Sequence, residues 1–430
     1  MKKGADITTR GDMRISKSPV HMSKVDEILS RGPAERSIID LVNALVFEAQ
    51  TLRASDIHIE PGEKGVVVRL RIDGVLQEKF MLDKTIHSEI ISRIKVLSWL
   101  RTDEHQTAQD GRFRIVLENG EPLDVRVSIT PTYYGENAVL RLLADKAEEF
   151  TLASLGFSQS DEEKLVRAIR RPHGMILSTG PTGSGKTTTL YTLIKMLNRK
   201  EVSIVTIEDP IEYAVSGITQ IQINPRTGLT FAQGLRSILR QDPNIIMVGE
   251  IRDAETAGIA VNTALTGHLL LSTLHTSDAA TTLPRLLDMG VDPYLVASTV
   301  NVAIGQRLVR KICEHCKEAC PLTQAEVESL AQTLPSGVVL PTKEETKHPV
   351  YYRGRGCEHC EQTGYRGRVG INEVLVVDAE VREAILRKAS AAVIRDIAVK
   401  NGMTTMFGDG LQKARAGQTT ISEVLRTINE

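Results

Sequence analysis

The run GPTGSGKT at residues 180–187 constrains this sequence more than any other feature. It matches G-x-x-x-x-G-K-[ST] without a gap and follows a short apolar run, 175–177, that predicts a buried strand. A helical stripe of apolar residues comes next: Leu190, Leu193, Ile194 and Leu197. A strand, a glycine-rich loop and a helix in this order aim backbone N–H groups and a helix N-terminus at phosphate oxygens. The segment therefore predicts a nucleoside triphosphate site; the alternative is a chance glycine-rich turn, against which this context argues.

The residues of this loop have distinct predicted roles. Lys186 is expected to bridge the β- and γ-phosphates of ATP, and Thr187 is expected to hold Mg²⁺. The glycines of the loop allow a tight backbone path. The predicted nucleotide contacts are Gly180, Pro181, Thr182, Gly183, Ser184, Gly185, Lys186, Thr187 and Thr188.

Two acidic clusters follow apolar strands further along the chain, IEDPIE at 207–212 and GEIRD at 249–253. Carboxylates at the C-terminal edge of a parallel sheet face the phosphate loop. Glu208 is therefore predicted to orient or deprotonate the attacking water, and Glu250 to reach the Mg²⁺ ion or its water. The alternative for each acid is a helix cap or a solvent-facing side chain, and it weighs most for Glu212 and Asp253.

Two histidines, His268 and His275, enclose another apolar strand in TGHLLLSTLHT at 266–276. A lone histidine is more often a structural hydrogen-bonding residue than a catalytic one, so the spacing alone leaves both readings open.

Four of the five cysteines form two C-x-x-C pairs, Cys313 with Cys316 and Cys357 with Cys360. This spacing lets two thiolates reach one tetrahedral Zn²⁺ from one turn, and four sulfurs leave no open position. A structural zinc site is therefore predicted, against the alternative of free or disulfide-bonded cysteines. Cys320 remains as an ordinary reduced thiol.

The length of 430 residues predicts two or three domains. Residues 1–30 are read as a flexible basic arm. Alternating strands and helices over 31–147 predict an α+β domain with an antiparallel sheet, including hairpin signals at Asp73-Gly74 and Asn119-Gly120. Short apolar strands alternating with helices over 148–310 predict a parallel sheet covered on both faces. A zinc subdomain at 311–372 and a helical subdomain at 373–430 complete the chain.

Apolar run length and net charge argue against a membrane-spanning, a secreted and a strongly basic nucleic-acid-binding protein. No run approaches the ~18 apolar residues that span a bilayer, and the N-terminus lacks the apolar core of a secretory signal, so the chain is expected in the cytosol. The formal net charge of −1 gives no global attraction to nucleic acid and leaves only a local basic patch as the alternative.

Taken together, these residues closely resemble the type II secretion and type IV pilus assembly ATPases, a family of RecA-like hexameric motors. The resemblance runs from about residue 33 to the C-terminus. It is carried by RPHG (171–174), GPTGSGKTTTLY (180–191), IEDPIEY (207–213), LRQDPNIIMVGEIRDAETA (239–257), TGHLLLSTLHTSDA (266–279) and the tetracysteine segment.

The resemblance implies an α/β fold: a RecA-like P-loop NTPase domain with an N-terminal α+β (PAS-like) domain, a tetracysteine zinc subdomain and a C-terminal helical subdomain. It implies a homo-hexamer that is cytoplasmic and peripheral to the inner membrane, recruited by platform proteins there. It makes Glu208 and Glu250 the working acids and assigns both histidines to the coupling of nucleotide state to subunit contacts. Arg112 and Arg126 match family positions for an arginine finger; Arg236 and Arg240 are further candidates.

Three functions are weighed. The first is a motor that hydrolyses ATP to assemble a pseudopilus or pilus. The second is a nucleic-acid translocase, which the neutral charge and the lack of a nucleic-acid module oppose. The third is a scaffold without turnover, which the intact Lys186, Thr187, Glu208 and Glu250 oppose. The choice between a secretion pseudopilus and a type IV pilus stays open, although the runs KTTTLY and SILRQDPNIIMVGEIRDAETA resemble the secretion branch somewhat more.

Overall fold

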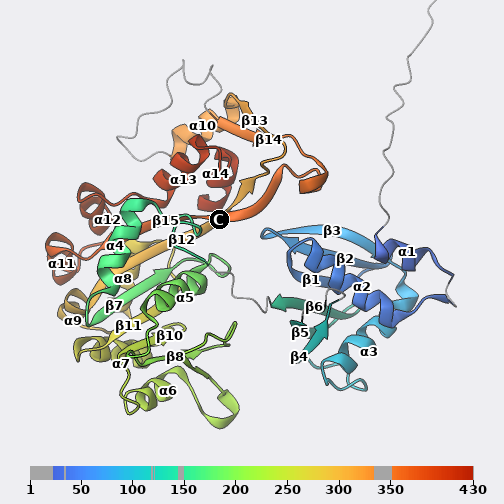
Figure 1. The fold of residues 1–430 in the computed structure, drawn as a ribbon, viewed down its shortest axis with the longest axis horizontal. Coiled ribbons are helices and arrows are strands. Elements are labelled where there is room, and N and C mark those ends of the chain that lie inside the picture. The colour runs from blue at the N-terminus through green and yellow to red at the C-terminus, as the bar shows by residue number, and fades with distance from the viewer. Residues whose placement is uncertain are drawn as a thin grey trace, which may run out of the picture. The chain divides into compact units, whose positions relative to one another are not determined.

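The computed structural model, drawn in Figure 1, describes residues 23–32, 35–117, 120, 122–143, 150–333 and 351–429. The chain divides into two compact units, residues 1–143 (unit 1) and 144–430 (unit 2). In the described residues, no helix has the length and apolar character that crossing a bilayer requires.

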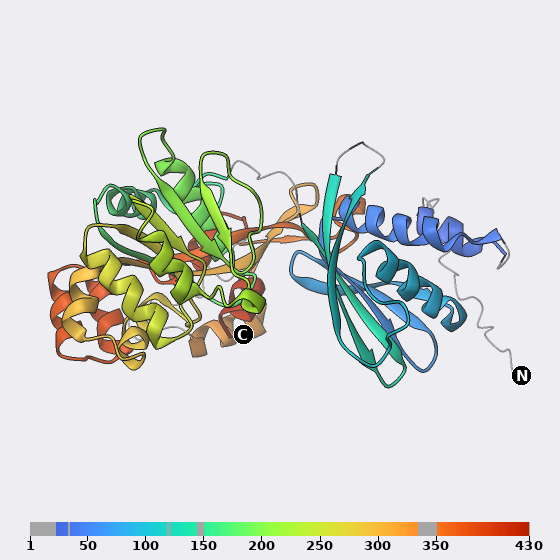
Figure 2. The ribbon, with the colours of Figure 1, turned by 90° about the horizontal axis from the view of Figure 1, so that it is seen from below.

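Unit 1 is a six-stranded antiparallel sheet in the order β3-β2-β1-β6-β5-β4. Its strands are β1 Ala54–Pro61, β2 Val66–Ile72, β3 Val75–Leu82, β4 Gln109–Val116, β5 Pro122–Thr132 and β6 Gly135–Leu143. Its helices are α1 Lys24–Ser30, α2 Ile38–Thr51, the 3-10 turn Lys84–Ile86, and α3 His87–Leu97. Helices α2 and α3 lie on one face of this sheet (Figure 2), and their apolar side chains share one core with that face. The predicted α+β organisation of this region is confirmed.

The N-terminal arm predicted at residues 1–30 needs a correction. Residues 24–30 form α1, capped by Ser23, whose side chain accepts a hydrogen bond from Asp26 N. Val25 and Ile28 bury their side chains in the core of unit 1. Apolar residues at a spacing of three place both on one helix face, and this short pattern was missed. The remainder of the predicted arm, residues 1–22, lies outside the described residues.

Unit 2 is a seven-stranded sheet in the order β15-β12-β7-β11-β10-β8-β9, parallel except for β15. Its strands are β7 Gly174–Thr179, β8 Ile204–Glu208, β9 Thr219–Gln222, β10 Ile245–Val248, β11 Leu269–Leu274, β12 Val300–Ile312 and β15 Tyr365–Val376. Along β7, Met175 and Leu177 join one core, whereas Ile176 joins the core of the opposite face. Both faces of the sheet are therefore covered, as the continuous apolar strands predicted.

Helices flank these strands and continue to the C-terminus. The first six α-helices that the structure describes in unit 2 are α4 Gln159–Ile169, α5 Lys186–Leu197, α6 Phe231–Ile238, α7 Ala254–Leu265, α8 Ala279–Asp288 and α9 Pro293–Thr299. Those of the remainder are α10 Gln324–Thr333, α11 Ala379–Leu386, α12 Ala391–Lys400, α13 Met406–Arg415 and α14 Ile421–Asn429. A two-stranded sheet pairs β13 Lys317–Cys320 with β14 Tyr351–Gly354.

The subdomain boundaries predicted at 310/311 and 372/373 fall inside β12 and β15. These two strands pair over most of their length, from Val302 opposite Val376 to Ile312 opposite Tyr365. Backbone pairing between segments so far apart in sequence holds the cysteine-bearing region and the parallel sheet in one unit. Those boundaries therefore do not separate compact bodies in the structure.

Candidate active site

The phosphate loop leaves β7, a fully buried strand between β12 and β11. Gly180 has φ of +143°, and a Cβ there would lie 2.3 Å from the carbonyl oxygen of Gln306 on β12. Gly185, with φ of +92°, precedes the first residue of α5. Glycine is thus required at Gly180 both for the backbone angle and for the close approach of β12.

Lys186 begins α5 and is 8% exposed. Its Nζ donates hydrogen bonds to the carbonyl oxygens of Gly180 at 2.8 Å and Pro181 at 2.9 Å. Burial lowers the pKa of Lys186, and the nearby charge of Glu250 acts in the opposite direction. The lysine side chain is therefore folded over the loop, where its charge faces the backbone cradle.

Glu250 follows β10 and Gly249 at the same sheet edge and is 9% exposed. Its Oε2 lies 3.1 Å from Nε2 of His275, which follows β11, and its Oε1 pairs with the Arg252 guanidinium. The hydrogen bond that Arg252 donates to the Glu250 carboxylate raises the pKa of Arg252. The structure thus brings together three predicted residues, Lys186, Glu250 and His275, and adds Arg252.

The loops after β7 and β11 are joined directly. Thr179 Oγ1 donates to the carbonyl oxygen of Leu274 at 3.1 Å, and Thr276 N donates to Thr179 Oγ1 at 3.0 Å. The backbone that carries His275 is therefore fixed to the residue that precedes Gly180.

Glu208 is the last residue of β8 and is only 2% exposed. Its Oε2 accepts a hydrogen bond from the hydroxyl of Tyr191 on α5. Its Oε1 accepts from Thr206 Oγ1 at 2.6 Å and from Gln220 Nε2, on β9, at 3.1 Å. Sequence reasoning missed Tyr191 and Gln220: the phenol sits in an apolar helical stripe, and the amide reaches Glu208 only through the pairing of β9 with β8.

The other acidic candidates take ordinary positions. Asp253 is the N-cap of α7 and accepts hydrogen bonds from Thr256 N at 2.8 Å and Thr256 Oγ1 at 3.0 Å. The capping alternative is therefore correct for Asp253. Glu212 is exposed.

His268 is not part of this site. The amide of Gly174, at the start of β7, donates to the carbonyl oxygen of His268 at 3.1 Å. The phosphate loop leaves the other end of β7, about 20 Å away at roughly 3.3 Å per residue. A six-residue strand separates the two histidines and places them at its opposite ends. The role expected for His268, in coupling nucleotide state to subunit contacts, stays a prediction.

Arg112 and Arg126 belong to unit 1, where they are direct cross-strand partners on β4 and β5. Arg126 in turn stands opposite Arg141 on β6. Arg141 Nε donates to Asp56 Oδ1 at 3.0 Å. Three arginines therefore form a row across neighbouring strands, and Arg141 was missed because only the strand register reveals it.

The weaker arginine candidates have local partners in unit 2. Arg236 pairs with Glu255 at 2.7 Å, and Arg240 Nη1 donates to the carbonyl oxygen of Arg236 at 2.9 Å.

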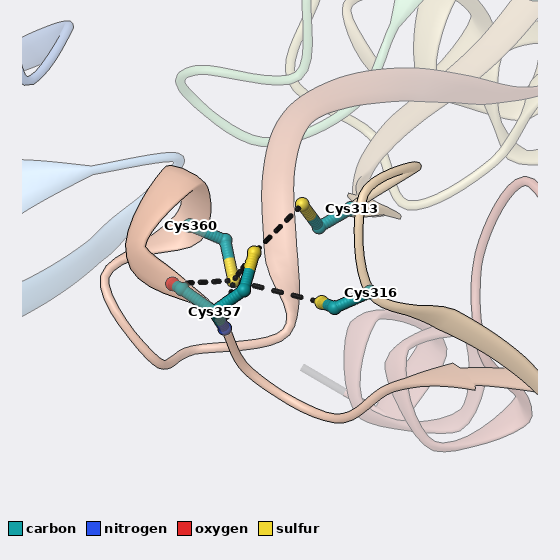
Figure 3. A group of neighbouring side chains, drawn as sticks. All are labelled: Cys313, Cys316, Cys357 and Cys360. Atoms are coloured by element: carbon teal, nitrogen blue, oxygen red, sulfur yellow. Dashed lines mark hydrogen bonds between the residues drawn. The ribbon is translucent and has the colours of Figure 1, made fainter.

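Two of the paired cysteines follow β12 and two precede β15. Their four side chains gather in one place, as Figure 3 shows. The Sγ atoms of Cys313 and Cys357 lie 3.8 Å apart, as do those of Cys316 and Cys360, and those of Cys357 and Cys360 lie 3.7 Å apart. Tetrahedral coordination at a Zn–S distance of about 2.3 Å requires S···S separations of about 3.8 Å. These three separations match that value, and all four sulfurs lie within 4.8 Å of one another, so the cluster could hold one tetrahedral ion.

Residues around this cluster support the same reading. The backbone amides of Cys357 and Gly364 donate to the Cys360 sulfur, each at 3.2 Å, as suits a thiolate ligand. Cys320 lies outside the cluster, and its sulfur accepts a hydrogen bond from Arg353 Nε at 3.0 Å.

Comparison with known proteins adds to this geometry. A family model described as Type II/IV secretion system protein matches residues 33–426. Type II secretion system protein E of Xanthomonas campestris pv. campestris is 47% identical over 406 residues, which are 94% of this chain and 70% of that protein. The type IV pilus assembly ATPase PilB of Thermus thermophilus is 46% identical over 388 residues, 90% of this chain and 42% of that one. The solved structure of the pilus retraction motor PilT with bound ADP has a TM-score of 0.59 at 25% identity and covers 89% of this chain and 96% of its own.

Proposed function

The chain belongs to the type II/IV secretion system protein family, and from this premise we propose that it is an ATPase that powers assembly of a pseudopilus or pilus. The observation that carries the proposal is the meeting, at one sheet edge, of the glycine loop, Lys186 and Glu250. A loop of this kind binds phosphates through its backbone amides and a single lysine.

The residues have the following roles. The loop from Gly180 to Thr188 binds the triphosphate, and Lys186 exchanges its carbonyl partners for β- and γ-phosphate oxygens. Thr187 and Glu250 hold Mg²⁺, whose chemistry is to neutralise charge that develops on the phosphate oxygens. His275 restrains the Glu250 carboxylate from the neighbouring strand.

Glu208 orients and deprotonates the attacking water. A carboxylate is suited to this work when its position is fixed before the reaction begins. The three hydrogen bonds that Glu208 accepts supply that restraint.

The arginine row of unit 1, Arg112, Arg126 and Arg141, supplies positive charge to the nucleotide in an assembled homo-hexamer. Like charges directly opposite one another repel and destabilise a sheet. An anion that binds beside the arginine row would offset this repulsion. Alanine at Arg112 is therefore expected to reduce turnover in the assembled ring only.

The four cysteines hold one structural Zn²⁺. Its cage is closed by four sulfurs, so it stabilises the fold of the region after β12 and takes no part in hydrolysis.

The chain works in the cytoplasm at the inner membrane, where platform and recruiting proteins engage it. Its relatives include a type II secretion protein and a type IV pilus assembly ATPase at nearly equal identity, which is compatible with either client.

Phosphate release by the purified, Mg²⁺-loaded protein tests the proposal. Wild-type chain should release phosphate from ATP, whereas Lys186→Ala should lose turnover or nucleotide binding. Lys200→Ala, an exposed lysine just beyond the same helix, is the matched control and should retain activity. If wild-type protein, tested as an oligomer, neither bound ATP nor released phosphate, the proposal that the chain is an ATPase motor would be refuted.

A further inference from the structure

We propose that Tyr191 is a positioning residue for ATP hydrolysis: its buried hydroxyl holds the Glu208 carboxylate in the orientation that the attacking water requires. This inference rests on the proposed function and adds to it a residue that neither touches nucleotide nor lies in the phosphate loop.

Tyr191 lies on the inner face of α5 and is 1% exposed. Its hydroxyl donates to Oε2 of Glu208. The ring of Tyr213 packs edge-on against the Tyr191 ring, with centroids 4.6 Å apart. The phenol therefore occupies a closed site with a fixed ring, and a fixed ring can hold a carboxylate more rigidly than a solvent-exposed donor can.

The direction of this hydrogen bond follows from the neighbouring donors. Gln220 Nε2 lies 3.1 Å from Glu208 Oε1, 3.2 Å from the Tyr213 carbonyl oxygen and 3.4 Å from the Tyr191 oxygen, so its two N–H groups are shared among three acceptors. The Tyr191 oxygen thus faces an amide donor on one side and a carboxylate on the other. A phenol has one proton, so that proton lies toward Glu208. Burial and the charge of Glu208 both raise the pKa of Tyr191, so the hydroxyl keeps its proton at every working pH.

The three side chains around Glu208 come from three elements and leave it little freedom. Thr206 and Gln220 hold Oε1 from β8 and β9, while Tyr191 holds Oε2 from α5. Both carboxylate oxygens are fixed, yet a carboxylate has about four acceptor positions, so one remains for a water. The arrangement restrains the acid while leaving it able to accept a proton.

Tyr191 also relates Glu208 to the phosphate site. Lys186 and Tyr191 belong to the same helix, five residues apart, which is about 7.5 Å along its axis. Glu208 stands on a strand separated from β7 by β11 and β10. The hydroxyl of Tyr191 is therefore a direct tie between the base and the helix that carries the phosphate-binding lysine. Removing it should disturb the reacting geometry without disturbing nucleotide binding.

Steady-state hydrolysis by Tyr191→Phe tests this inference, because phenylalanine keeps the ring and removes only the hydroxyl. We expect kcat to fall about 10-fold or more while KM and the affinity for a non-hydrolysable ATP analogue change by less than about 2-fold. Tyr213→Phe is the matched control: it changes the adjoining ring in the same way, and its kcat should stay near wild type.

The double variant distinguishes positioning from a merely structural role. If Tyr191 acts through Glu208, adding Tyr191→Phe to Glu208→Gln should slow hydrolysis no further, because the two effects are not additive. A kcat unchanged in Tyr191→Phe, an equal further loss in the double variant, or loss of analogue binding would each overturn the inference. The proposed function fails separately, on absence of turnover in the wild-type protein.

Discussion

The ion pair network of Glu423 yields a quantitative prediction for the C-terminal helix. Glu423 lies on α14, and its side chain is 3% exposed. Its Oε1 accepts from Arg310 at 2.6 Å, and Arg426 donates to it at 3.0 Å. Arg310 belongs to the strand that leads into the cysteine cluster. Glu423 therefore fixes the last helix to that strand.

The magnitude follows from the pKa of Glu423. Burial alone would raise that pKa, but the hydrogen bonds from Arg310 and Arg426 outweigh burial and lower it from 4.5 to about 2. At about 1.4 kcal/mol per pKa unit, the charged form stabilises the folded state by about 3 kcal/mol. Since the folded pKa lies below the unfolded one, this stability is present above about pH 4.5 and disappears as the pH falls toward 2.

Hydrogen–deuterium exchange of α14 in Glu423→Gln is the assay. A loss of about 3 kcal/mol in local stability should accelerate exchange of the helix about 100-fold at pH 7. Glu383→Gln, on α11, removes an exposed pair with Arg387 at 3.9 Å and should change exchange of its helix by less than a few-fold. Denaturation at a series of pH values should show the difference between wild type and Glu423→Gln vanishing near pH 2. Exchange of α14 within about 3-fold of wild type at pH 7 would refute the reasoning.

Three further outcomes are expected. Mild chelation should release about one zinc per chain and loosen the region after β12 while ATP binding survives. Metal analysis and proteolysis should show the same effect for Cys360→Ser and no effect for Cys320→Ser. A zinc-free wild-type protein of unchanged stability would contradict this prediction. Gly180→Ala should lose ATP binding, because the added Cβ would clash with β12. Gly183→Ala has open space for its Cβ and meets only the backbone strain of φ +79°, so it should bind ATP more weakly without losing binding. Equal ATP affinities of the two variants in a filter assay would contradict the packing argument. Glu250→Gln should bind the ATP analogue but release phosphate at least about 100-fold more slowly, and normal turnover would remove it from the mechanism.

Local patterns predicted much of the architecture. Alternation of apolar residues along β2 and the Asp73-Gly74 turn after it suffice to place that hairpin. The continuous apolar strands around the glycine loop indicate a sheet covered on both faces, as found. In both cases the signal comes from neighbouring residues, and burial on one face or two follows directly from period and composition.

Other features of the site could not be predicted from residues adjacent in the sequence. His268 and His275 look equivalent in the sequence, but a strand of six residues places them at its opposite ends. Tyr191 looks like one more apolar helix position, but its hydroxyl reaches Glu208 across the sheet. The arginine row depends on a cross-strand register that a shift of one residue would abolish.

The sequence by itself determined the phosphate loop, the acids after the strands, and the two cysteine pairs, because each is a short run whose spacing meets a fixed chemical requirement. Only the tertiary structure decided which of these groups meet, which donors surround Glu208, and that β12 and β15 join the cysteine region to the parallel sheet. These depend on contacts between segments tens to hundreds of residues apart, where strand order and packing, rather than local spacing, set the distances.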